Sequence, residues 1–233
     1  MRPAPEELLA TGEIEILGLL PYASNVTLLA KVNTGPDEAL AVYKPRRGER
    51  PLWDFPDGTL CVREYAAAVV DAKLGWGLVP PTVLRDGPAG IGAVQLYIEE
   101  DENFDVQEVV QTHPDELRRI ALLDVVINNA DRKAGHLIAD ADGKLWGVDH
   151  GVCFHDEPKL RTVIWTFEGE AIAPELLSDL ETFAHDVSWK AELGELLAPY
   201  EIDALCDRTT TLLRAKRFPH PPAGRHHVPW PPW

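Results

Sequence analysis

Residues 121–154 read ALLDVVINNADRKAGHLIADADGKLWGVDHGVCF, and this stretch decides how the rest of the chain is interpreted. Its first seven residues are apolar except for Asp124 and include neither glycine nor proline. A polar segment with a proline at position 114 precedes them, and this combination is typical of a helix start. The pattern therefore predicts a buried helix from about Pro114 to near Asn129.

Two short strand-like runs follow the helix, Leu-Ile-Ala and Lys-Leu-Trp-Gly-Val, separated by the turn sequence Asp-Ala-Asp-Gly at residues 140–143. This pattern predicts a β-hairpin, because glycine can adopt the positive φ that a tight turn needs. The two ends of a hairpin lie close together. His136 precedes the first strand and Asp149 follows the second, so we expect their side chains to lie side by side, with Asp131 nearby.

Two carboxylates and an imidazole that converge suit two kinds of chemistry. They can bind a divalent cation that holds nucleotide phosphates, or they can activate a metal-bound water. The surrounding sequence favours the first. Its motifs resemble those of the phosphatidylinositol 3-/4-kinase-like family, whose catalytic loop reads DRHxxN and whose metal loop is DFG-like. Here they read DRKAGH at residues 131–136 and DHG at residues 149–151, in the same order and with a hairpin between them.

The resemblance implies a role for each residue of these loops. Asp131 would orient the hydroxyl of the acceptor, with Lys133 in the same catalytic loop, and Asp149 and His136 would hold the cation that accompanies ATP. Two positions depart from the family pattern, because Lys133 replaces a histidine and His136 replaces the metal-binding asparagine. Mn²⁺ tolerates a nitrogen ligand better than Mg²⁺ does, so we expect a preference for Mn²⁺ over Mg²⁺, or a cation held by Asp149 without His136.

Three runs that precede this stretch, at residues 12–18, 26–32 and 39–45, predict strands. By resemblance, the turn between the first two would lie over the nucleotide phosphates with Ser24 at its tip; no glycine-rich loop is present, so a plain hairpin is the alternative. The third strand ends near Lys44, which resembles the lysine that anchors ATP in kinases. The alternative for Lys44 is a surface lysine at the end of a strand.

A helix is predicted after this strand, because Thr59 can cap it, apolar residues recur at helical spacing, and Gly75 can end it. Glu64 lies in this helix. In kinase-like proteins a glutamate on such a helix holds the ATP-anchoring lysine, so the resemblance pairs Glu64 with Lys44. A solvated helix residue is the alternative for Glu64.

Runs at residues 79–84 and 92–98 predict two more strands, which complete a small antiparallel sheet. By resemblance, the second of these strands leads to the linker whose backbone meets the adenine. This assigns Gln95, Leu96 and Tyr97 to the ATP site.

The expected fold class is α+β, with a two-lobed kinase-like fold. The N-terminal lobe would hold the antiparallel sheet and one helix, and the mainly helical C-terminal lobe would hold the catalytic hairpin. A proline-rich tail follows, in which proline excludes helix and central strand and predicts extended or disordered chain that is available to a partner. The expected boundaries are residues 1–100, 101–217 and 218–233.

Composition restricts the partners. The formal net charge is −16, with 38 acidic and 22 basic residues, and it repels nucleic acid and anionic membrane surfaces. Lys159 and Arg161 are a sparse version of the basic segment that lipid kinases of the family present to an inositol phosphate. We therefore expect no nucleic-acid binding, no stable membrane binding, and an acceptor hydroxyl on a protein or small molecule in preference to a lipid. Three dispersed cysteines and no export signal favour a cytoplasmic protein.

The leading hypothesis is an ATP-dependent phosphotransferase that uses Mn²⁺ or Mg²⁺. A nucleotide-binding pseudokinase with a regulatory or scaffolding role is the main alternative, and the departures at Lys133 and His136 support it. A metal-dependent phosphohydrolase built on His136, Asp149, His150 and His155 is the second alternative, and it would require neither Lys44 nor Glu64.

Overall fold

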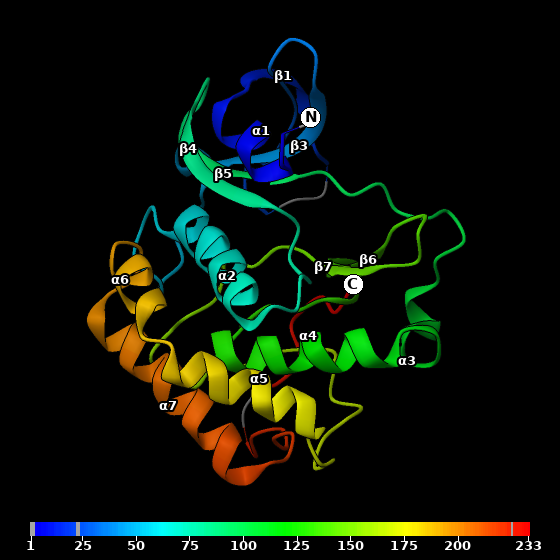
Figure 1. The fold of residues 1–233 in the computed structure, drawn as a ribbon, viewed down its shortest axis with the longest axis vertical. Coiled ribbons are helices and arrows are strands. Elements are labelled where there is room, and N and C mark those ends of the chain that lie inside the picture. The colour runs from blue at the N-terminus through cyan, green and yellow to red at the C-terminus, as the bar shows by residue number, and fades with distance from the viewer. Residues whose placement is uncertain (1–2, 22–23, 225) are drawn as a thin grey trace.

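The computed structural model describes residues 3–21, 24–224 and 226–233. Figure 1 shows an antiparallel sheet at one end of the molecule and a group of helices at the other, with helix α2 beside both. The sheet has five strands, and the predicted hairpin forms a separate pair of strands within the helical part. This arrangement confirms the predicted α+β, two-lobed fold class. The domain boundaries predicted near residues 100 and 217 stay predictions.

The five-stranded sheet has the order β1-β2-β3-β5-β4, and every neighbouring pair is antiparallel. Helix α1 (Pro5–Thr11) covers one face and adds Leu8 and Leu9 to the apolar core of the sheet. The strand predicted at residues 79–84 begins later, at Thr82, because Pro80 and Pro81 lack the N–H that a strand start would use, and the strand predicted at residues 92–98 spans Gly90–Leu96. The strands are β1 (Glu13–Leu19), β2 (Leu28–Asn33), β3 (Glu38–Pro45), β4 (Thr82–Gly87) and β5 (Gly90–Leu96).

Helix α2 (Leu60–Leu74) ends at Gly75, which has a φ of +71°, as predicted. Its N-terminus differs from the prediction, because the Thr59 hydroxyl makes no capping hydrogen bond. The carboxylate of Glu49 instead accepts hydrogen bonds from the N–H groups of Leu60 and Cys61, at 3.0 and 2.8 Å. An acidic side chain at this position also suits the positive end of the helix dipole.

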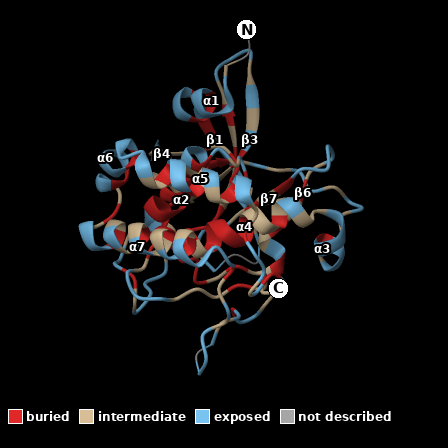
Figure 2. Cartoon of the chain, turned by 60° about the horizontal axis from the view of Figure 1, so that its bottom comes forward, coloured by how far each residue is buried: buried red, intermediate tan, exposed pale blue. Residues whose placement is uncertain are grey.

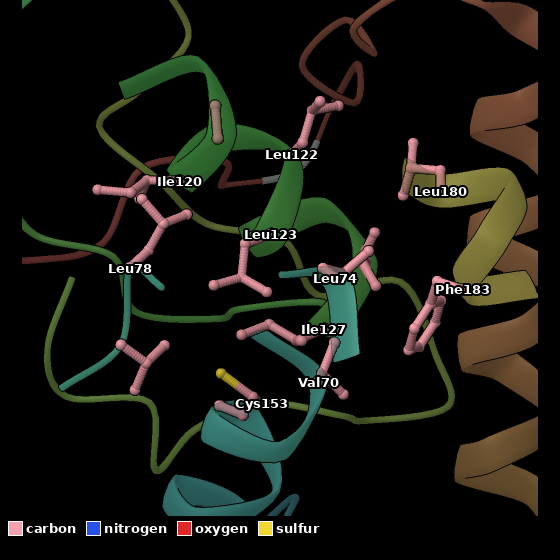
Figure 3. Close-up of a cluster of buried hydrophobic side chains, with 14 of the residues drawn as sticks. Val70, Leu74, Leu78, Ile120, Leu122, Leu123, Ile127, Cys153, Leu180 and Phe183 are labelled. Carbon is pink, nitrogen blue, oxygen red and sulfur yellow. The ribbon is translucent and has the colours of Figure 1, made fainter. Parts of the chain in front are cut away.

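The core of the helical part is built around α2 and α4 (Pro114–Ile127). Figure 3 shows Val70 and Leu74 of α2 against Leu123 and Ile127 of α4. In Figure 2 the buried positions of both helices face the interior. Because Cys61 and Val62 at the other end of α2 pack with Ala93 of β5, this helix joins the sheet to the helical core. The other helices are α3 (Val109–Thr112), α5 (Pro174–His185), α6 (Ser188–Gly194) and α7 (Pro199–Ala215).

Helix α4 is followed by the predicted hairpin, and three short 3₁₀ helices complete the described elements. Helix α4 ends as predicted, since Asn128 adopts a left-handed conformation with φ of +53°. The predicted hairpin is present, with Gly143 at φ +78° in its turn. Its strands are β6 (Leu137–Ala139) and β7 (Leu145–Gly147), and the 3₁₀ helices are η1 (Arg46–Gly48), η2 (Val106–Glu108) and η3 (Ala134–His136).

The described part of the proline-rich tail contains neither helix nor strand, in agreement with the sequence. It runs back along the helical part. The carbonyl oxygen of Pro232 accepts a hydrogen bond from the N–H of Ala134 at 2.9 Å, and that of His227 accepts one from the N–H of Thr162 at 3.0 Å. Figure 1 accordingly places the C-terminus beside the β6-β7 hairpin. Among the described residues, none of the helices has the length and apolar character needed to span a membrane.

Candidate active site

Lys44 on β3 lies between two carboxylates that come from distant parts of the chain. Its Nζ donates a hydrogen bond to Oε2 of Glu64 on α2 at 2.8 Å and another to Oδ1 of Asp149 at 3.1 Å. Burial alone would lower the pKa of Lys44, but Asp149 and Glu64 together raise it above its ordinary value. Lys44 is therefore a fixed cation at the junction of the sheet and the loop that follows the β6-β7 hairpin.

Asp149 lies two residues after β7 and has an unusual backbone conformation. Its φ of +61° is uncommon for a residue other than glycine and requires that the surrounding structure fix the chain. Its Oδ2 lies 3.4 Å from Nε2 of His136, as the hairpin predicts. The Lys44 ammonium is the main cause that lowers the pKa of Asp149 below its usual range, even though burial opposes it. The side chain remains 53% exposed, so this charged carboxylate can reach a ligand.

The imidazole of His136 is neutral at pH 7. Burial lowers its pKa to about 4, against the opposite influence of Asp149, and the nearby Arg132 and Lys133 cations lower it further. Its Nδ1 lies 3.4 Å from the N–H of Lys133, a long contact that favours the proton on Nε2. A neutral imidazole can bind a cation through nitrogen, but doing so through Nε2 would require the proton to move to Nδ1.

Asp131 lies in the predicted catalytic loop and is held by two contacts. Its N–H donates to Oδ1 of Asn129 at 2.9 Å, and its Oδ2 lies 3.0 Å from Nζ of Lys133. Burial raises the pKa of Asp131 although the Lys133 cation opposes the rise. Lys133 therefore contacts the carboxylate directly, in a position where the family pattern has histidine.

A buried arginine, which the sequence analysis did not single out, links these loops to helix α4. Arg132 is fully buried and forms a two-pronged ion pair with Asp124, with contacts of 2.9 to 3.2 Å. It also donates to the carbonyl of Val148 at 2.8 Å and contacts Nε2 of His150 at 2.6 Å. A signal was available in the sequence, because Asp124 is the single polar residue in an apolar helical run and a buried carboxylate needs a partner.

His150 connects this arginine to Glu64. Since a guanidinium can only donate, Nε2 of His150 must accept and its proton must lie on Nδ1. Burial and the adjacent Arg132 cation lower the pKa of His150 well below its ordinary value, so the ring is neutral. The backbone N–H of His150 donates to Oε2 of Glu64 at 3.0 Å. Nδ1 of His150 and Oε1 of Glu64 are both buried without a hydrogen bond and lie 3.9 Å apart.

The four residues of the phosphohydrolase alternative do not form one cluster. His150 faces Arg132, and His155 packs edge-on against Phe55 with its Nδ1 3.1 Å from Asp156. Within the described residues, no group of three or more histidine, cysteine, aspartate or glutamate side chains is arranged to hold a metal.

The remaining predicted ATP-site residues make no side-chain hydrogen bond to Lys44, although Gln95 and Leu96 lie on the strand paired with β3. Gln95 is buried, and its Nε2 donates to Oγ1 of Thr82 at 2.8 Å inside the sheet. The N–H groups of Leu96 and Tyr97 donate to the carbonyls of Pro81 and Leu40. Any contact of Leu96 or Tyr97 with adenine would therefore use their carbonyl oxygens or side chains. Ser24 is exposed between β1 and β2, directly after two residues outside the described part.

The comparison with curated proteins identifies a relative that matches along nearly the whole chain. Protein Rv2133c of Mycobacterium tuberculosis (strain ATCC 25618 / H37Rv) is 40% identical over 268 residues, which covers 99% of this chain and 96% of the relative. The chain belongs to the Rv2133c family. No model of a protein family matches the sequence.

More distant relatives of this Rv2133c family member are plant lipid kinases by name. Phosphatidylinositol 4-kinase gamma 4 of Oryza sativa subsp. japonica is 29% identical over 176 residues, and the protein of the same name from Arabidopsis thaliana is 25% identical over 191 residues. These matches cover 67% and 74% of this chain but only 31% of each plant protein.

Solved structures with the same fold are kinases of low sequence identity. The Golgi casein kinase with Mn/ADP bound has a TM-score of 0.57 at 15% identity, over 90% of this chain and 74% of that one. The Helicobacter pylori proinflammatory kinase CtkA has a TM-score of 0.52 at 13% identity, over 90% and 94% of the two chains. The Rv2133c family member therefore has a kinase-like fold.

The link between Arg132 and His150 gives a prediction about stability. In His150→Phe, one buried N–H of the guanidinium loses its acceptor, so we expect the free energy of unfolding to fall by roughly 1–3 kcal/mol. Urea denaturation of the wild type and the variant measures the difference. His185→Phe is the matched control, because His185 is exposed on α5, and it should leave stability nearly unchanged. Equal stability of His150→Phe and the wild type would contradict the assigned contact.

Proposed function

We propose that this protein is an ATP-dependent phosphotransferase of the phosphatidylinositol 3-/4-kinase-like type. The observation that supports the proposal most strongly is the position of Lys44 between Glu64 and Asp149 in a kinase-like fold. Kinases use such a lysine to hold nucleotide phosphates and such an aspartate to hold the accompanying cation. The motifs at residues 131–136 and 149–151 support the same assignment.

The residues around Lys44 suit a nucleotide with a divalent cation. Asp149 offers a charged, half-exposed carboxylate, and His136 offers a neutral imidazole beside it. In the proposed complex, Lys44 would contact the phosphates while Glu64 keeps it in place, and Asp149, with or without His136, would hold the cation. The cation would supply positive charge that offsets the negative charge developing on the transferred phosphoryl group.

In the proposed transfer step, Asp131 acts on the hydroxyl of the acceptor. The acceptor hydroxyl oxygen would form a bond to the γ-phosphorus, the bond between that phosphorus and the β,γ-bridging oxygen would break, and ADP would leave. Asp131 would orient the hydroxyl and receive its proton. Burial raises the pKa of Asp131, which makes the carboxylate a better proton acceptor than an exposed aspartate. Lys133 would hold the carboxylate in position through their 3.0 Å contact.

The acceptor proposed here is a hydroxyl of a protein or a small molecule in preference to a lipid. The net charge of −16 disfavours an anionic membrane surface. In addition, Nζ of Lys159 lies 2.9 Å from Oδ2 of Asp54, and both side chains are largely buried, so this lysine is already neutralised. Arg161 then remains as the available cation of the segment.

A nucleotide-binding pseudokinase is the second candidate, and one contact favours it. The salt bridge from Lys133 engages Oδ2 of Asp131, one of the atoms that would accept the proton of the hydroxyl. If this salt bridge persists in the nucleotide complex, the protein would bind ATP without transferring its phosphoryl group.

The proposed anchor is tested by Lys44→Met. The substitution removes a charge-assisted contact to phosphate in a partly buried site, so ATP binding should weaken by about 1.5 to 3 kcal/mol. Isothermal titration calorimetry with ATP and Mn²⁺ measures this change. Lys31→Met on the neighbouring strand is the control, because Lys31 also pairs with a carboxylate, that of Glu38. The Lys31→Met variant should bind ATP with the affinity of the wild type. Unchanged affinity in Lys44→Met would overturn the assignment.

The choice of metal is tested by His136→Asn. An imidazole ligand favours Mn²⁺ over Mg²⁺, so replacing it with the oxygen of asparagine should shift nucleotide affinity toward Mg²⁺. The measurement compares the affinity for ATP in Mn²⁺ and in Mg²⁺ for the wild type and the variant, and turnover is compared in the same way. If the ratio of the two affinities is the same in both proteins, His136 does not contact the cation and Asp149 holds it alone.

A further inference from the structure

A cavity of about 850 Å³ lies on the acceptor side of Asp131. Its walls come from three separate parts of the chain: the loop before α2, the segment that follows the metal loop, and the C-terminal tail. Its lining includes Trp53, Asp131, Arg161, Trp165, Val228 and Trp230. Since Asp131 is the residue that would receive the proton of the acceptor, a molecule bound in this cavity can present a hydroxyl to it.

Arg161 is fixed next to Asp131 through its backbone. Its N–H donates to the carbonyl of Asn129 at 2.9 Å, and its own carbonyl accepts from the N–H of Arg132 at 3.0 Å. These two partners flank Asp131 in sequence. In the part of the chain that the structure describes, the guanidinium of Arg161 has neither a hydrogen bond nor a carboxylate within ion-pair distance, although it does lower the pKa of Asp131. A partly exposed arginine that lines a cavity without a protein partner is suited to an anionic ligand.

Two tryptophans at the rim of the cavity are almost fully exposed. Trp53 is 91% exposed and Trp230 is 90% exposed, and they are far apart in the sequence. Exposed indole rings that meet at one cavity are typical of a surface that binds the flat face of a ring. Neither ring fills the core, and one face of the Trp53 ring lies over the Lys159 ammonium, with Nζ 5.0 Å from the ring centroid.

The tail forms one wall of this cavity and is held there by hydrogen bonds. The carbonyl of His227 accepts from the N–H of Thr162 at 3.0 Å and from Nε1 of Trp165 at 2.9 Å. These contacts bring Val228 and Trp230 to the cavity that Arg161 also lines. The tail therefore supplies one wall of the cavity, which stays open to solvent on another side.

We propose that this cavity binds the acceptor, and that the acceptor is a small hydroxylated ring compound with one anionic group. The ring would lie against Trp53 and Trp230, the carboxylate or phosphate would bind Arg161, and a hydroxyl would face Asp131. The part of this inference that gives Asp131 a role rests on the proposed function. The binding of such a compound, in contrast, depends only on the cavity and can be measured without ATP.

The test uses two anionic probes with hydroxylated rings, glucose 6-phosphate and 4-hydroxyphenylacetate, and their neutral counterparts, glucose and 4-hydroxybenzyl alcohol. Ligand-observed NMR titrations of the full chain give the affinities. The wild type should bind at least one anionic probe more tightly than its neutral counterpart. The probe that binds distinguishes a sugar ring from an aromatic ring. Arg161→Gln should weaken this binding about tenfold, and Trp230→Ala should weaken it several-fold.

Arg214→Gln is the matched control, since Arg214 is exposed on α7, away from the cavity, and it should bind the probe like the wild type. The proposal is overturned if no probe binds the wild type, if anionic and neutral probes bind equally, or if Arg161→Gln and Arg214→Gln behave alike. ATP binding by the wild type is measured separately. The absence of ATP binding would count against the proposed function. Whether the cavity binds an anionic ring compound is decided by the probe affinities alone.

Discussion

The buried guanidinium of Arg132 is the interaction on which the arrangement of the site depends. It joins Asp124 on α4 to the carbonyl of Val148 and to the ring of His150, so one side chain fixes the loop at residues 131–136, the end of the hairpin and the loop at residues 149–151. Burying a charged pair costs several kcal/mol in solvation, and only good geometry with additional hydrogen bonds offsets that cost. Arg132 satisfies this condition, because each of its three nitrogens donates to a named acceptor.

The polar chain continues from this arginine to the sheet. His150 contacts Glu64 through its backbone N–H, and Glu64 holds Lys44 on β3. Helix α2 is also held at Arg63, the residue before Glu64. Arg63 donates to Glu201 on α7 at 2.6 Å and to the carbonyl of Cys153 at 2.7 Å. Glu64 therefore has little freedom to move away from Lys44. The site is preorganised by contacts that lie mostly behind it, which leaves Asp149 half exposed toward a ligand.

The parts of the site that the sequence predicted are those with short-range signals. The turn at residues 140–143 and the two strands beside it bring His136 and Asp149 together, because the open ends of paired antiparallel strands lie side by side, here with Leu137 opposite Gly147. The pairing of Lys44 with Glu64 came from resemblance, and the structure places the two side chains in contact. The fold class followed from the same order of elements, and the kinase-like neighbours agree with it.

The parts that the sequence did not predict depend on contacts between distant residues. The cap of α2 comes from Glu49, eleven residues before Leu60, where no local capping pattern indicates it. The role of Arg132 required knowledge that Asp124 is buried beside it. The tail was expected to be extended or disordered, and its composition contains nothing that predicts the hydrogen bonds that the carbonyls of Pro232 and His227 accept from Ala134 and Thr162.

The central claim is that Lys44 and Asp149 form a ready-made site for nucleotide phosphates and their cation. A crystal structure of the protein with a non-hydrolysable ATP analogue and Mn²⁺ tests it most directly, since the anomalous signal of manganese locates the cation independently of the nucleotide. The account predicts phosphate oxygens within hydrogen-bonding distance of Nζ of Lys44 and manganese bound to the carboxylate of Asp149. Nucleotide bound elsewhere, or manganese away from Asp149, would contradict it.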